Sequence, residues 1–187
     1  MENLLKRVVG ILLRPDETWA EIKEEQTTMY QIVGEYAAVL AAGPAIAGFL
    51  GSIFSGSNFF VSLLWGVLYY AFSLAGVWSI TKVLNFLATN LNIEHDEVTI
   101  LKLVAYSYTA FFISGIFFII PPLYWLSVGG LYGFYLFYAG VFHLLECSKE
   151  EKLDFAVISM FAVALILILV FALAGIISGI NVSYLKI

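Results

Sequence analysis

The sequence predicts an all-α, polytopic membrane protein: a bundle of five transmembrane helices preceded by a short amphipathic interfacial helix region. The chain of 187 residues is 61% hydrophobic and only 12% charged, whereas soluble globular chains are about 25% charged. Several apolar runs also reach the roughly 20 residues that a helix needs to cross the hydrocarbon core. The five runs are 32–54, 59–84, 103–120, 123–145 and 155–180. Helices are expected because a membrane barrel would instead show alternating strands of about 10 residues.

The connections between these runs are of two kinds. Ser55–Asn58 and the Pro121–Pro122 corner are short and uncharged, whereas 85–102 and 146–154 are longer and carry acidic and basic residues. With five spans, the N-terminus and both charged loops lie on one side, which holds every Lys and Arg except Lys186. The bias of basic residues toward the inside then predicts a cytoplasmic N-terminus and an external C-terminus.

Helix caps are expected at the charged loops. Asp96 is placed to cap the helix that leads into the third span. Before the fifth span, either Ser148 and Glu151 form a capping box or Asp154 is the N-cap.

Residues 1–30 form an amphipathic segment ahead of the membrane domain at 31–187. Its first part, Leu4–Leu12, has an apolar stripe beside basic residues, which is typical of a helix in the membrane interface. Pro15 is expected to begin a second helix with Trp19 and Ile22 on one face. The segment either packs under the bundle and orients it, or offers a contact surface to a partner.

Polar groups and helix breaks within the first span could carry a function. Glu35 is the one acidic residue inside a span; its carboxylate either reaches the headgroups or pairs with Lys82 or Lys102. Gly43 and Pro44 interrupt the same span, either as a packing kink or as a break that exposes carbonyls to a substrate.

The fourth span contains both small and aromatic residues. Gly129 and Gly133 form a small-xxx-small strip for helix contact, within the protein or between two copies. Tyr124, Tyr135 and Tyr138 fall near one helical face and are expected to look into the bundle, where their hydroxyls would find acceptors.

Two cytoplasmic clusters contain metal-ligand residue types. His143, Glu146 and Cys147 share a helical face at the end of the fourth span, and His95 lies in the other charged loop. Neither cluster matches an established ligand motif, so these residues are weak candidates beside the alternative of a solvated acidic loop. No cofactor is expected.

Motifs and charge exclude several classes of function. The chain lacks the His-Glu-x-x-His and Gly-x-Ser-x-Gly motifs, and it has no Gly-rich phosphate loop, so an enzyme is not expected. The net charge of −5 and the lack of a polybasic block argue against nucleic-acid binding.

Three segments resemble motifs of the Yip domain family, whose multi-span members are named for binding Ypt/Rab-type GTPases in eukaryotes. The segments are Leu12-Leu-Arg-Pro-Asp-Glu-Thr-Trp-Ala-Glu-Ile22, Leu40-Ala-Ala-Gly-Pro44 and Ala105-Tyr106-Ser-Tyr-Thr-Ala110. Pro15, Trp19, Gly43, Pro44 and Tyr106 are the positions that carry the resemblance. The resemblance implies a five-span fold and a role in membrane organisation, in a small prokaryotic-type member located in a prokaryotic cytoplasmic membrane.

Two functions remain open from the sequence. The first is a non-enzymatic scaffold that organises membrane lipids or recruits a protein partner, or a second copy, through its cytoplasmic face. The second is a small transporter or channel with a cavity near Gly43, Pro44, Glu35 and Tyr106, together with Tyr135 and Tyr138.

Overall fold

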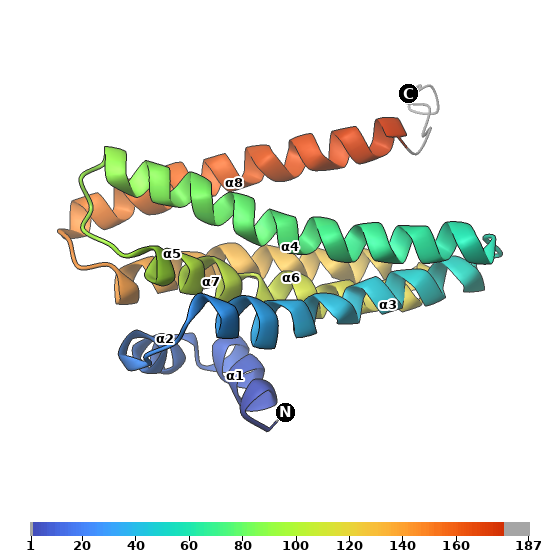
Figure 1. Cartoon of the computed structure of the whole chain (residues 1–187), viewed down its shortest axis with the longest axis horizontal. Helices are drawn as coiled ribbons and strands as arrows, with labels where there is room; N and C mark the ends of the chain where they lie inside the picture. Colours follow the sequence, from blue (N-terminus) through green and yellow to red (C-terminus); the bar gives the residue numbers. More distant parts are fainter. Residues whose placement is uncertain (1, 178–187) are drawn as a thin grey trace.

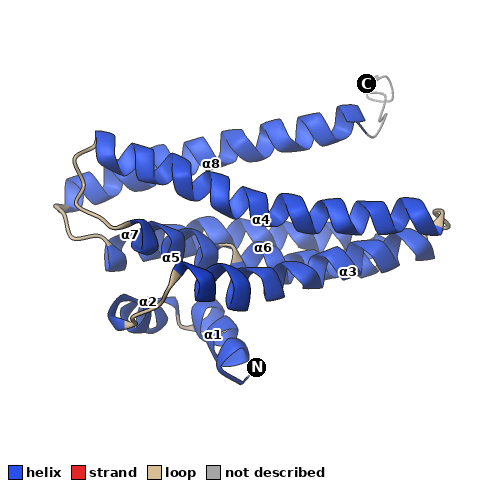
Figure 2. Cartoon of the chain, viewed as in Figure 1, coloured by secondary structure: helices blue, strands red, loops and turns tan. Residues whose placement is uncertain are grey.

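The computed structural model describes residues 2–177, and every regular element within that range is a helix (Figure 2). Residues 155–177 of the predicted fifth span are part of one long helix. In chain order the elements are α1 (Glu2–Leu13), α2 (Pro15–Glu24), η1 (Gln31–Ala37), α3 (Ala38–Phe54), α4 (Phe59–Asn90), α5 (Glu97–Ser107), α6 (Thr109–Ser114), η2 (Gly115–Ile119), η3 (Pro121–Leu131), α7 (Tyr132–Leu144) and α8 (Lys149–Ile177).

Among residues 2–177, four helical segments are long and apolar enough to cross a membrane: Gln31–Phe54, Phe59–Asn90, Glu97–Ile119 and Pro121–Leu144. They correspond to the first four predicted spans. The predicted fifth span, 155–180, coincides with α8 as far as Ile177, and its last three positions lie outside the described residues. Four of the predicted spans are therefore helical segments that could cross a membrane, and the count of five stays a prediction.

Three of these spans are not uniform α-helices. The first begins with the π-helical turn η1, and the third changes to the 3₁₀-helix η2 at Gly115. The fourth begins as the 3₁₀-helix η3, because Ile120 is extended and Pro121 then starts a new helical turn. A proline at a first helical position loses no hydrogen bond, so this corner turns the chain without charged residues.

Local caps fix where several helices begin. The Asn58 side chain accepts a hydrogen bond from the Phe60 amide, and Asp96 accepts one from the Thr99 amide at 2.7 Å. Ser148 and Glu151 exchange hydrogen bonds of 2.8 and 3.2 Å as a capping box at the start of α8. The bond from the Ser148 amide holds the pKa of the Glu151 carboxyl below its usual range. The predicted Asp96 cap and the predicted box are both confirmed.

The charged segments gather at one end of the bundle, which we call the charged end. Figure 1 shows α2, the loop 91–96 and the loop 145–148 together at that end, and the turn at 55–58 at the opposite end. Contacts join these segments: Lys23 pairs with Glu146 at 2.7 Å, and Lys82 pairs with Glu97.

The third span, α5 with α6 and η2, lies in the centre of the bundle, which we call the central span. It contacts α3, α4, α7 and η3 (Figure 1). Two glycines allow these elements to approach closely. A Cβ atom at Gly51 of α3 would overlap the Phe118 carbonyl oxygen, and one at Gly133 of α7 would lie 2.9 Å from the Ser107 carbonyl oxygen.

Candidate functional site: the docked N-terminal hairpin

Helices α1 and α2 form a compact hairpin, the N-terminal hairpin, that folds under the bundle (Figure 1). Arg14 leaves the helical conformation between them, as expected for a residue that precedes a proline. The Thr18 hydroxyl donates to the Arg14 carbonyl at 2.9 Å. Gly10 lies against Thr18, so closely that a Cβ atom there would stand 2.8 Å from the Thr18 hydroxyl oxygen. The Thr18 hydrogen bond and the lack of a side chain at Gly10 together determine how the two helices cross.

Trp19 anchors the hairpin to the bundle. Both Trp19 and Ile22 have no exposed surface, and α2 packs along α7. The indole reaches Gly140, where a Cβ atom would come within 2.7 Å of the ring, and it meets Tyr106 edge-on with centroids 6.2 Å apart. Burial of an indole is a large stabilising contribution, so the hairpin is a fixed part of the structure.

From Trp19 an aromatic row continues into the bundle. Tyr106 of α5 meets Tyr36 of η1 with ring centroids 4.6 Å apart. The Tyr36 hydroxyl is hydrogen-bonded to the Thr109 hydroxyl at 2.6 Å. These side chains are buried. They connect the hairpin to the first and third spans through direct contacts.

Two basic residues secure the end of α2. Lys102 of α5, only 7% exposed, donates to the carbonyls of Ile22 at 2.9 Å and Glu25 at 2.5 Å. These carbonyls lack partners within α2. A cation near a helix C-terminus also interacts favourably with the negative end of the helix dipole. Arg7 of α1 pairs with the Glu25 carboxylate at 2.5 Å and lies over the Tyr106 ring. Sequence reasoning missed this use of Lys102, although a lysine in an apolar run needs acceptors.

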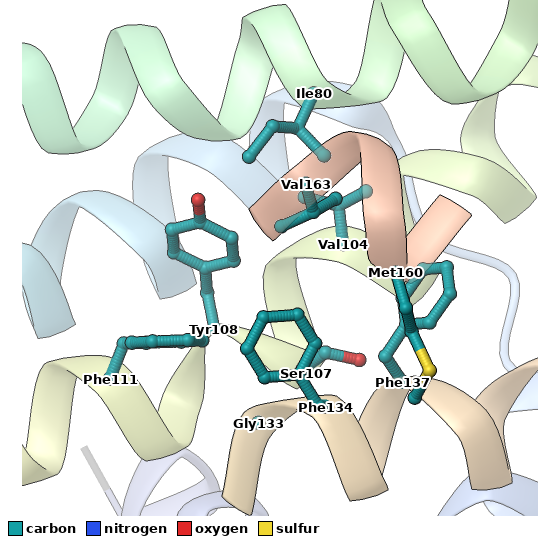
Figure 3. Close-up of a pocket in the computed structure, with 10 residues that line it drawn as sticks. All are labelled: Ile80, Val104, Ser107, Tyr108, Phe111, Gly133, Phe134, Phe137, Met160 and Val163. Atoms are coloured by element: carbon teal, nitrogen blue, oxygen red, sulfur yellow. The ribbon is translucent and has the colours of Figure 1, made fainter. Parts of the chain in front are cut away.

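The bundle interior contains a small apolar cavity of about 20 Å³ (Figure 3). Its walls come from α4 to α8, and its polar side chains are those of Ser107 and Tyr108. The lining residues are Ile80, Val104, Ser107, Tyr108, Phe111, Gly133, Phe134, Phe137, Met160 and Val163. A space of this size holds at most about one water molecule, so it is packing space and no path for a solute.

The residues expected to line a transport cavity do not come together. Glu35, Tyr135 and Tyr138 are exposed on the outside of the bundle, as is Tyr124, whereas Tyr106 is buried beneath Trp19. The expectation that the tyrosines of the fourth span face the interior is therefore wrong. Neither proposed partner of Glu35 pairs with it, because Lys82 binds Glu97 and Lys102 binds the end of α2.

The small residues of the spans serve internal packing. Pro44 lies against Gly115, where a Cβ atom would stand 2.6 Å from the proline ring, and Gly43 lies near Ile116. Gly133 is buried against Phe111, whereas Gly129 is exposed. Phe111 covers Gly133 within the chain, and contact of the Gly129–Gly133 strip with a second copy stays a prediction.

The side chains that were weak candidates for metal ligands make other contacts. His143 Nδ1 is hydrogen-bonded to the Ala139 carbonyl, and His95 Nδ1 to the Ile93 carbonyl. Glu146 pairs with Lys23, which holds the pKa of its carboxyl below the usual range, and partial burial raises the pKa of the Cys147 thiol. Within residues 2–177 no three His, Cys, Asp or Glu side chains group to hold an ion, so the structure does not bring these candidates together.

The fold and the docked hairpin define a polytopic helical membrane protein. The Yip1 domain model matches residues 9–180, and the chain belongs to that family. It is also 29% identical over 190 residues to the inner membrane protein YohC of Escherichia coli K12, covering 94% of this chain and 97% of the relative. YohC of E. coli O6:H1 matches to the same extent. No solved structure matches.

Proposed function

We propose that the protein is a non-enzymatic scaffold of the cytoplasmic membrane that recruits a protein partner at its charged end. The observation that carries the proposal is the docked hairpin. Trp19 and Lys102 hold α2 in one position beside the loops that follow α4 and α7. A surface fixed in this way can present side chains to a partner without first being ordered, which lowers the entropic cost of binding.

The charge of this surface indicates the chemistry of its partner. Apart from Glu2 and Glu35, the acidic residues of the chain belong to α2 and its C-cap, to the loops at the charged end, or to the helix starts beside them. Glu24, Glu94 and Glu150 are exposed there. An acidic surface favours a partner segment rich in Lys and Arg.

The positive-inside rule supports a cytoplasmic location for this end. Every Lys and Arg except Lys186 lies in the hairpin, at the charged end, or in the span residues next to it, and such residues favour the cytoplasmic side. The E. coli relatives are named as inner membrane proteins, which agrees with a cytoplasmic membrane. In this orientation the acidic surface meets cytoplasmic proteins.

A photocrosslinking amino acid at Glu24 tests the proposal in native membranes. Glu24 is exposed on α2, and Ser57, exposed in the turn at the opposite end, is the matched control position. We expect a discrete protein adduct from position 24 that position 57 does not give. An adduct at twice the mass of the chain would identify a second copy as the partner. If the two positions give the same background pattern, the scaffold proposal fails.

A further inference from the structure

A groove of about 540 Å³ lies between α1 and α2. It is lined by both charges and apolar groups. Arg7 and Arg14 stand among its basic residues, and Glu17 and Glu21 among its acidic ones. Glu25 also lines the groove and pairs closely with Arg7 at 2.5 Å, whereas two other ion pairs are looser: Arg14 lies 3.8 Å from Glu17, and Arg7 lies 3.6 Å from Glu21.

One donor in the groove is left without an acceptor. The Nη1 atom of Arg7 is buried and lies 3.6 Å from a Glu21 carboxylate oxygen, beyond hydrogen-bond distance, and it has no hydrogen-bond partner within the described residues, while Nη2 binds Glu25. A buried guanidinium nitrogen without an acceptor is unfavourable, and phosphate oxygens suit the planar donor fork of arginine. Lys6 and Arg14 line the same groove and could bind the remaining oxygens of such a group.

The apolar part of the groove continues onto an exposed face of α1. Leu5, Val9 and Leu13 recur every four residues, so they share one side of the helix, and they are 62%, 53% and 76% exposed. Val9 and Leu13 also line the groove. Helix α1 contacts α6, and its Leu12 carbonyl accepts a hydrogen bond from Tyr132 of α7. Helix α1 therefore lies beside membrane-spanning helices, and acyl chains are the medium that surrounds such helices.

We propose that the groove binds a phospholipid whose headgroup carries a phosphate and a primary ammonium, as phosphatidylethanolamine does. The phosphate binds the Arg7 and Arg14 side, the ammonium donates to Glu17 and Glu21, and the acyl chains lie on Val9 and Leu13. The carboxylates oppose a headgroup with net negative charge. A quaternary ammonium has no N–H to donate to them. The charge pattern thus selects the zwitterionic primary amine over glycerol and choline headgroups.

Native mass spectrometry of the delipidated full-length protein tests this selection. The probes are phosphatidylethanolamine, phosphatidylglycerol and phosphatidylcholine with the same dioleoyl chains. We expect phosphatidylethanolamine to bind best, and Arg14→Gln to weaken it about tenfold, the effect of one charge-assisted hydrogen bond. Lys149→Gln, at an exposed position of α8 outside the groove, is the control and should bind like the parent protein.

Substitution of the acidic residues is the most specific test of the proposal. The double variant Glu17→Gln/Glu21→Gln should lose the preference for phosphatidylethanolamine and gain affinity for phosphatidylglycerol, because the groove becomes positive. A crosslinking residue at Leu13 should form a lipid adduct. Equal binding of the three lipids, strongest binding of phosphatidylglycerol by the parent, equal loss in Lys149→Gln, or a protein adduct at position 13 would each overturn the proposal.

Discussion

The central span and α4 have nearly the same apolar character but different surroundings. The mean hydropathy of the most apolar stretch is 1.6 in Glu97–Ile119 and 1.7 in Phe59–Asn90. Within those stretches, 72% of the central span is buried inside the protein, compared with 11% of α4. Hydropathy thus identifies a membrane helix without indicating whether lipid or protein surrounds it.

The difference lies in what each helix presents to its neighbours. The central span buries Lys102, Thr109 and Ser114, each of which has a hydrogen-bond acceptor or donor nearby. Helix α4 instead presents large apolar residues such as Phe60, Trp65 and Phe72 to the outside. Since lipid tails are as apolar as leucine, association of helices depends on close packing and hydrogen bonds. The following substitutions test that contrast.

The largest effect is expected for Trp19→Ala compared with Trp65→Ala. Trp19 has no exposed surface and packs on Tyr106 of the central span, whereas Trp65 of α4 is 47% exposed. Loss of a fully buried tryptophan costs about 3–5 kcal/mol, and loss of one that faces lipid should cost far less. Thermal unfolding of the detergent-solubilised protein, followed by circular dichroism, measures both. Equal shifts of the unfolding temperature in the two variants would contradict the difference between the central span and α4.

A smaller but still large effect is expected for Gly51→Ala compared with Gly48→Ala. Both residues lie on α3, one turn apart. A Cβ atom at Gly51 would overlap the Phe118 carbonyl of the central span, whereas nothing lies within 4 Å of one at Gly48. Overpacking of this kind costs about 3 kcal/mol. Gly48→Ala should be neutral or slightly stabilising in the same unfolding assay. If Gly51→Ala is also tolerated, the tight contact between α3 and η2 is incorrect.

The smallest effect is expected for Thr109→Val compared with Ser73→Ala. Thr109 of the central span bonds Tyr36 of another helix, whereas Ser73 of α4 bonds the Tyr69 carbonyl of its own helix. Hydrogen bonds between membrane helices contribute about 0.6–1.7 kcal/mol, and Ser73→Ala should change stability by less. Unfolding midpoints in a denaturing-detergent titration resolve such differences. A larger loss for Ser73→Ala would contradict the contrast.

Features set by neighbouring residues were predictable from the sequence. The Asp96 cap and the Ser148–Glu151 box depend on residues three apart in the chain, so no tertiary information was needed. It was harder to predict which face of a helix points into the protein. In the fourth span the buried face carries Gly133 and Gly140, and the tyrosines at 135 and 138 lie outside. Periodicity separates two faces of a helix, but both lipid and protein interior accept apolar residues.

The N-terminal hairpin shows the same division. Pro15 and the spacing of Trp19 and Ile22 indicated a helix with one apolar face, and α2 has that face. Its docking through Lys102, Arg7 and Tyr106 joins distant segments of the chain. Lys102, for example, binds the carbonyl of Ile22, which lies 80 positions earlier. No local pattern encodes such a pairing.

The sequence alone predicts a helical membrane protein, the positions of four of its candidate spans, and how several helices begin. Each of these depends on the length and composition of one segment relative to the bilayer. The three-dimensional structure was needed to show which span is central, that Glu35 and the tyrosines of the fourth span lie outside, and that the hairpin is fixed beneath the bundle. Those features depend on contacts between distant segments, and in a bilayer hydrophobicity does not distinguish such contacts from contact with lipid.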